Sequence, residues 1–263
     1  MHSVSKLPKT IIHVLLIVVL ITTSCYDEED YDLTSIEAFS KITVDRSENT
    51  IPADGNSNVT FTFKFPTDGD SNLTALRLIA SNGTFLESKN DTLNVNFIET
   101  ANTIKGEEDR KEAVATLVAS TTPGESNVNV RVLNYEKDYT ITFKEALPTS
   151  VSLSTNVDYI KNDTIKEINL IGRIRSSSGV ASQGTTAYFF SNPPNSVGFL
   201  KNTEAESNSQ GTVQTTFVFT DTSYKGDIKF TLKVDKEESE NENDCQREGN
   251  PCHQDTVSVK VID

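Results

Sequence analysis

Few residues in the chain can carry out chemistry, and its three cysteines are the most informative of them. Cys245 and Cys252 flank a short segment that contains one glycine and one proline. Turn-forming residues between two nearby cysteines favour a small disulfide loop when the protein is secreted. A bond that closes a loop of about eight residues would stabilise the folded chain by roughly 2.5 kcal/mol in the chain-entropy model. We therefore predict a disulfide bond between Cys245 and Cys252.

The third cysteine, Cys25, follows a stretch with the layout of a secretory signal peptide. Two lysines give residues 1–10 a positive charge, and residues 11–21 form an apolar run that is too short to span a membrane as a helix. The small residues 22–24 before Cys25 resemble the lipobox of bacterial lipoproteins, although Thr22 stands where leucine is commonest. This resemblance implies that residues 1–24 are removed and that Cys25 is lipidated. The alternative is an ordinary secreted protein with an incidental cysteine at this position.

An acidic run follows directly after Cys25 and covers residues 27–32. It resembles the surface-export signal of Bacteroidota lipoproteins, which implies a location on the outer face of the outer membrane. The same charges would also keep residues 25–40 extended as a solvated tether, because like charges repel. The two interpretations are compatible.

The charge of the chain limits what it can bind. Removal of residues 1–24 and their two lysines changes the formal net charge from −14 to −16. Such a chain is repelled by nucleic acid and by anionic bilayers. We therefore expect acyl chains on Cys25, rather than electrostatics, to hold it at the membrane.

The sequence argues against catalysis and against a bound cofactor. His253 is the only histidine after residue 24, so neither a zinc site nor a Ser-His-Asp arrangement finds enough partners. The chain lacks a phosphate-binding glycine loop, and its paired carboxylates lie in charge runs that are typical of solvated surface. We expect a non-catalytic protein with no cofactor and no small-molecule substrate.

The pattern of apolar residues predicts an all-β fold. Residues 59–65 alternate strictly between apolar and polar side chains, as in a strand with one buried face. Similar short runs recur between turn signals, and residues 105–112 are the one stretch where a helical turn could intervene. The pattern restarts near Pro148, which divides the chain into residues 41–146 and residues 147–263.

Several turn motifs resemble bacterial Ig-like domains of the invasin/intimin type. Residues 51–57 (Ile-Pro-Ala-Asp-Gly-Asn-Ser) resemble the opening turn of such domains, and residues 120–130 resemble the stretch near their C-terminus. In the second half, residues 178–189 and 207–213 resemble further turns of the family, although the Pro-Ala-Asp-Gly opening is missing there. The resemblance implies two tandem Ig-like β-sandwich domains, the second with an acidic insertion at residues 236–253.

Two kinds of minor site remain. Asp68 and Asp70 offer the oxygen ligands that Ca²⁺ prefers, but they also fit a plain solvated turn. Thr92, Thr164 and Thr256 each lie in an Asp-Thr-apolar triplet, which resembles the O-glycosylation site of Bacteroidota surface proteins. The alternative for the threonines is chance recurrence in a threonine-rich β protein.

These observations favour an adhesion or display module with a protein or polysaccharide partner at the cell surface. The alternative is an accessory subunit of an outer-membrane nutrient-uptake or secretion complex. Because loops on a rigid scaffold carry most binding sites, we expect any partner to contact the acidic insertion, residues 236–253. The insertion could equally serve only to keep the outer tip soluble.

Overall fold

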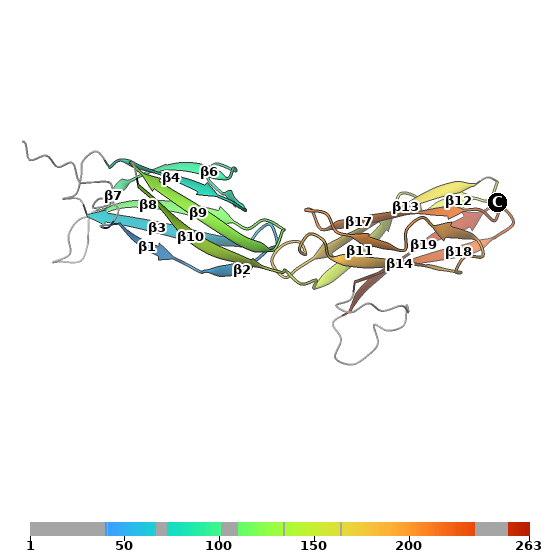
Figure 1. The fold of residues 1–263 in the computed structure, drawn as a ribbon. Coiled ribbons are helices and arrows are strands. Elements are labelled where there is room, and N and C mark those ends of the chain that lie inside the picture. The colour runs from blue at the N-terminus through green and yellow to red at the C-terminus, as the bar shows by residue number, and fades with distance from the viewer. Residues whose placement is uncertain are drawn as a thin grey trace, which may run out of the picture.

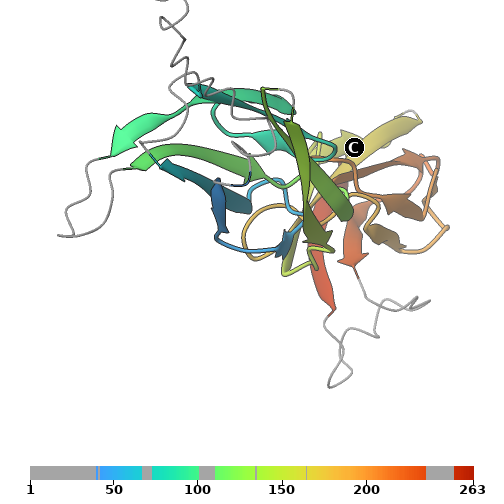
Figure 2. The same ribbon diagram turned by 60° about the vertical axis from the view of Figure 1, so that its left-hand side comes forward.

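The computed structural model describes Ser40 and residues 42–66, 73–100, 110–133, 135–163, 165–234 and 252–263. The strands in these ranges form two β-sandwiches that lie end to end, with the C-terminus at the far end of the second (Figure 1). In the view turned by 60°, the first sandwich comes forward of the second, as expected for an elongated arrangement (Figure 2). Across the ranges given above, no helix is long and apolar enough to cross a membrane.

The first sandwich consists of two sheets. Its strands are β1 (Thr43–Arg46), β2 (Thr50–Pro52), β3 (Asn58–Pro66), β4 (Ala75–Ala80), β5 (Thr84–Phe85), β6 (Thr92–Asn96), β7 (Ile98–Thr100), β8 (Arg110–Val118), β9 (Gly124–Val132) and β10 (Tyr135–Lys144). One sheet has the order β1-β3-β8-β5, with β7 also paired to β8, and the other has the order β2-β10-β9-β4-β6.

The second sandwich also consists of two sheets. Its strands are β11 (Ser150–Thr155), β12 (Tyr159–Lys161), β13 (Lys166–Arg175), β14 (Thr186–Asn192), β15 (Gly198–Leu200), β16 (Glu204–Glu206), β17 (Thr212–Phe219), β18 (Gly226–Val234) and β19 (His253–Ile262). The sheet orders are β11-β13-β17-β15 and β12-β19-β18-β14-β16.

Both sandwiches begin with the same change of sheet. In the first, β1 pairs antiparallel with β3, and the chain then crosses so that β2 pairs parallel with β10. In the second, β11 pairs antiparallel with β13, and β12 pairs parallel with β19. The repeated topology and the facing sheets confirm the predicted fold class, all-β with Ig-like sandwiches.

The alternation in the sequence becomes the two faces of each sheet. Val59, Phe61, Phe63 and Phe65 of β3 are fully buried, whereas the side chains between them turn away from the core. Each buried phenylalanine contributes about 1.5–3 kcal/mol of hydrophobic stabilisation. The second core is built in the same way, with the rings of Phe217 and Phe230 packed edge to face at 5.0 Å.

The helical turn suggested for residues 105–112 is not formed in the part that the structure describes. β8 already begins at Arg110, and Glu112 pairs with Lys64 of β3 and with Ile98 of β7. This charged stretch is a strand because it forms hydrogen bonds with strands on both sides, and its local sequence does not indicate that pairing.

Candidate functional site

Most of the predicted site residues lie outside the described residues. This applies to Cys25, Asp68, Asp70, Thr164 and Cys245. Lipidation, calcium binding and the disulfide bond to Cys252 therefore stay predictions. The acidic insertion, residues 236–253, is described only from Cys252 onward.

The two described glycosylation candidates lie in different sandwiches. Thr92 begins β6 and donates its hydroxyl to Asp91 at 3.2 Å. Thr256 lies in β19, where its hydroxyl is 3.3 Å from that of Thr231. The carboxylate of the adjacent Asp255 accepts the backbone N–H of Leu153 at 2.7 Å, so this triplet also joins β11 to β19. Thr92 and Thr256, which the structure describes, therefore do not belong to a common site.

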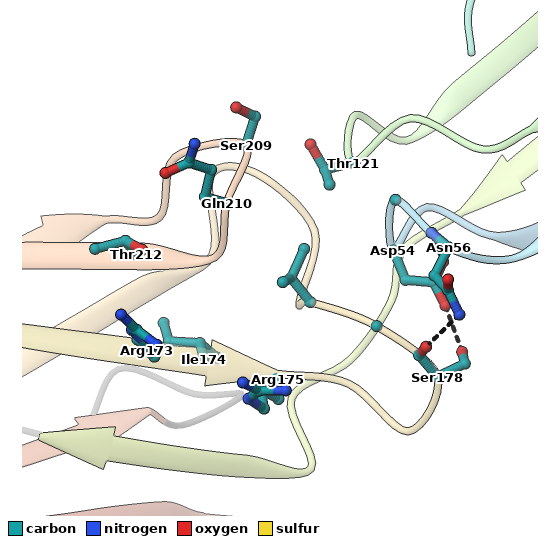
Figure 3. Close-up of a pocket in the computed structure, with 13 residues that line it drawn as sticks. Asp54, Asn56, Thr121, Arg173, Ile174, Arg175, Ser178, Ser209, Gln210 and Thr212 are labelled. Carbon is teal, nitrogen blue, oxygen red and sulfur yellow. Dashed lines mark hydrogen bonds between the residues drawn. The ribbon is translucent and has the colours of Figure 1, made fainter. Parts of the chain in front are cut away.

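The structure instead assembles a site where the two sandwiches meet. The turn that follows β2 contains Asp54, whose side chain is only 1 % exposed. Its Oδ1 accepts the backbone N–H groups of Asn56 at 2.9 Å and Ser57 at 2.6 Å. Its Oδ2 accepts the hydroxyl of Ser57 at 2.8 Å and, from the second sandwich, the hydroxyl of Ser178 (Figure 3). Asp54 thus holds its own turn and ties it to the other domain.

Backbone groups complete the connection. The carbonyl of Asp54 accepts the N–H of Val180 at 3.0 Å, and the carbonyl of Ala53 accepts the hydroxyl of Ser182 at 3.0 Å. Ser182 also bonds the linker in both directions, because its hydroxyl accepts the N–H of Ala146 and its N–H donates to the Ala146 carbonyl. The N–H of Gln183 donates to the Thr121 carbonyl at 2.8 Å. Two turns of the first sandwich and the linker are therefore all fastened to one loop of the second.

A glycine allows this close approach. A Cβ atom at Gly179 would lie 2.4 Å from the carbonyl oxygen of Asp54 and 3.2 Å from the Cβ of Asn56. Real Cβ atoms do not come this close to a backbone oxygen, so a larger residue at this position requires the domains to move apart.

The hydrogen bonds also determine the protonation state of Asp54. Burial by itself raises the pKa of this carboxyl, but the hydrogen bonds that it accepts outweigh burial and hold the pKa below its ordinary value of 3.8. The donors are the Ser178 hydroxyl, the backbone of Ser57 and Asn56, and the Ser57 hydroxyl. Asp54 therefore stays ionised at neutral pH.

Next to this junction lies a groove of about 560 Å³. It is lined by both sandwiches: Asp54, Gly55, Asn56 and Thr121 from the first, and Arg173, Ile174, Arg175, Ser178, Gly179, Val180, Ser209, Gln210 and Thr212 from the second. Figure 3 shows the turn with Ser209 and Gln210 on one side and the arginine-bearing strand β13 on another. We call this space the junction groove.

The charges that line the junction groove are unequal. Arg173 and Arg175 are exposed on the outer face of β13, and their guanidinium groups make no hydrogen bond or ion pair with any described residue. Asp54, the single carboxylate among the described lining residues, is buried and already accepts four donors. Among the described residues, the groove therefore offers two positive charges that no carboxylate pairs with, in a chain whose formal net charge is −14.

Sequence reasoning missed this groove. The two arginines alternate with buried residues, so they read as the outward face of an ordinary strand. The one available signal is the Arg-Ile-Arg-Ser-Ser-Ser-Gly stretch, residues 173–179, in which two like charges on one face run directly into a polar turn. Nothing in that stretch indicates that the turn after β2 closes the other side.

No protein-family model matches the sequence, and no curated protein matches it. Solved structures with a similar fold include the adhesin InvE of Yersinia pseudotuberculosis (17% identity over 84% of this chain and 59% of that one, TM-score 0.39). They also include InvD of the same organism (15% identity over 85% of this chain and 58% of that one, TM-score 0.37). A β-glycosidase of Bacteroides vulgatus is similar as well (14% identity over 86% of this chain and 26% of that one, TM-score 0.30). The chain spans less than two thirds of the length of these proteins. At such identities and scores, no function or residue role follows from the similarity.

Proposed function

We propose that the chain is a non-catalytic surface lipoprotein in which two Ig-like sandwiches form one stiff adhesion or display module. In this proposal Cys25 carries the lipid, residues 25–40 are the tether, and the outer membrane holds the protein with its sandwiches facing outward. The second sandwich then lies farthest from the membrane.

The fastened junction is the observation that supports this function best. A module that presents a binding surface at a distance must resist bending, and bending here would break the bonds at Ala53, Asp54 and Ala146. Each such bond contributes about 0.5–1.5 kcal/mol net, and a bond to a charged group about 1.5–3 kcal/mol. The proposal that the protein is not an enzyme rests on the scarcity of catalytic residue types, with His253 the only histidine after residue 24.

The test uses the producing cell. Mass spectrometry of the N-terminal peptide from native membranes should show Cys25 as the first residue, with acyl chains attached. Protease added to intact cells should remove both sandwiches, and cells that lack the protein should attach less to surfaces or to other cells. A matched strain with Cys25→Ser should neither retain the chain at the membrane nor restore attachment.

Two results would contradict this function. An unmodified Cys25, or cleavage elsewhere, refutes the lipid anchor. Normal attachment of the deletion strain, together with recovery of a stable complex from detergent-solubilised membranes, would favour the accessory-subunit alternative.

A further inference from the structure

We propose that the junction groove binds the carboxylate groups of an acidic polysaccharide through Arg173 and Arg175. This inference rests on the proposed surface function and names the chemical class of its ligand. It places the binding site at the domain junction rather than on the acidic insertion.

The two arginines suit a carboxylate ligand by type and by position. The guanidinium group forms paired, charge-assisted hydrogen bonds with a carboxylate, which lysine cannot reproduce. Residues i and i+2 of a strand lie on the same face, about 6.6 Å apart along the strand. Arg173 and Arg175 therefore point to the same side of β13 and are both available to one bound chain.

No described carboxylate pairs with these arginines. In the part of the lining that the structure describes, Asp54 is the only acidic residue, and its oxygens are directed at Asn56, Ser57 and Ser178. A buried carboxylate that already accepts several hydrogen bonds competes poorly with an incoming anion for the guanidinium groups. The groove thus has a local preference for anions although the whole chain is acidic.

The neutral part of the lining favours a sugar chain over an acidic peptide. Ser209, Gln210 and Thr212 on one side, with Thr121 on the other, offer hydroxyl and amide groups that match sugar hydroxyls. Among the described lining residues only Ile174 and Val180 have apolar side chains, so a peptide finds little room there for an apolar anchor. The volume of about 560 Å³ lies in the range of small-ligand pockets and suits a few sugar units of a longer chain.

The walls are held in place before any ligand binds. Asn208 Oδ1 accepts the N–H groups of Gln210 at 2.9 Å and Thr212 at 3.0 Å, which fixes one wall. The bonds of Asp54 and the bond from Asn56 to the Ser178 carbonyl at 2.8 Å fix the wall from the first sandwich. A preformed groove loses less conformational entropy when it binds.

The experiment measures binding by the purified full-length chain. The probes are polygalacturonate, its fully methyl-esterified form and poly-glutamate. Polygalacturonate should bind, and its neutral ester should bind about tenfold more weakly or worse, because esterification removes the charge that pairs with arginine. Replacing both arginines, R173Q/R175Q, should weaken binding of polygalacturonate about tenfold or more.

Two further variants serve as controls. R77Q/K229Q removes the same charge from exposed positions on β4 and β18, and it should bind as the wild type does. R173K/R175K retains the charge without the guanidinium geometry and should bind with intermediate affinity. Because the exchanged arginines are exposed and form no bond with a described residue, thermal unfolding of R173Q/R175Q should match that of the wild type.

The outcomes separate the proposals. Failure of polygalacturonate to bind, equal binding of the neutral ester, or full binding by R173Q/R175Q would each overturn the inference. Tighter binding of poly-glutamate than of polygalacturonate would assign the groove to an acidic peptide and overturn the polysaccharide. The measurement uses purified chain, so it can succeed even if the lipid anchor proves wrong. Conversely, if polygalacturonate does not bind, the cell experiments still test surface attachment independently.

Discussion

Asp54 combines two roles that usually fall to separate residues. Its side chain closes the turn after β2 through the N–H groups of Asn56 and Ser57, as aspartate does in many turns. The same carboxylate then accepts the Ser178 hydroxyl of the next sandwich. A turn motif in the first domain is therefore also the anchor of the second.

This dual role predicts that the junction weakens in acid. Because the pKa of Asp54 is lower in the folded state, this carboxylate stabilises the fold fully above its ordinary pKa of 3.8. Its contribution is lost as pH falls through the lower pKa of the folded state. Small-angle scattering should show a stiff particle at neutral pH and increasing bending below about pH 4. Asp54→Asn should bend at neutral pH and lose about 1.5–3 kcal/mol of stability. Identical pH profiles for the two proteins would rule out Asp54 as the cause.

Gly179 should be intolerant of any side chain. In Gly179→Ala the new Cβ meets the Asp54 carbonyl oxygen at 2.4 Å, so the turn must move away and the bonds of Val180 and Ser178 weaken. We expect a loss of about 1–3 kcal/mol, measured by chemical denaturation, with greater bending in scattering. Ser177→Ala, an exposed neighbour on the same loop, is the control and should behave as the wild type. An unchanged junction in Gly179→Ala would show that the approach is looser than the structure indicates.

At the scale of elements, β3 is an interior strand between β1 and β8 and carries three fully buried phenylalanines. Phe63→Ala removes a fully buried ring and should destabilise the first sandwich by about 3–5 kcal/mol. Thr62→Ala, on the opposite face of the same strand, should destabilise the sandwich by much less than Phe63→Ala does. Urea denaturation followed by circular dichroism measures both, and equal costs would contradict the assignment of faces.

The long strands of the fold follow from alternation, but the short ones do not. β3 contains the predicted run of residues 59–65, because its burial depends on side chains of its own sequence. β5 and β15 are only two and three residues long, and they are strands because they pair with β8 and β17. Such edge pairing depends on partners distant in the chain and leaves no periodic signal.

At the scale of the molecule, Ser182 should control how far the two sandwiches move. Its hydroxyl bridges Ala53 and Ala146, which belong to the turn and to the linker. Ser182→Ala leaves two buried backbone groups without a partner, which should cost about 1–3 kcal/mol and widen the range of domain angles in scattering. Ser154→Ala, an exposed serine hydrogen-bonded within its own sheet, provides the control. If Ser182→Ala scattered as the wild type does, the Ser182 hydroxyl would not control the angle, and the other bonds of the junction would be sufficient to hold it.

The second sandwich should also carry the predicted disulfide bond between Cys245 and Cys252. These two cysteines are close in sequence, so their bond should close a short local loop rather than join the two sheets. Non-reducing peptide mapping should find them joined. Reduction should leave the second sandwich folded at room temperature, and unfolding on reduction alone would show that the bond has a larger role.

The sequence by itself determined the class of fold and the burial of residues such as Phe61 and Phe63. These follow from local alternation and turn residues, which act over a few positions. It also contained the Pro-Ala-Asp-Gly turn, but only as a motif of one domain. Charge and residue content narrowed the functions that we propose, since they depend on composition alone.

Only the tertiary structure decided that the two sandwiches form a groove between them. The junction groove exists because Asp54 and Asn56 of one sandwich meet Ser178, Gly179 and the arginines of β13, more than one hundred residues later. That contact depends on the orientation of two folded domains, and no periodicity within either domain encodes it. The acidic insertion attracted attention in the sequence because it is long and charged. The groove had no such signal, because each of its walls is an ordinary turn or strand until the other wall is placed beside it.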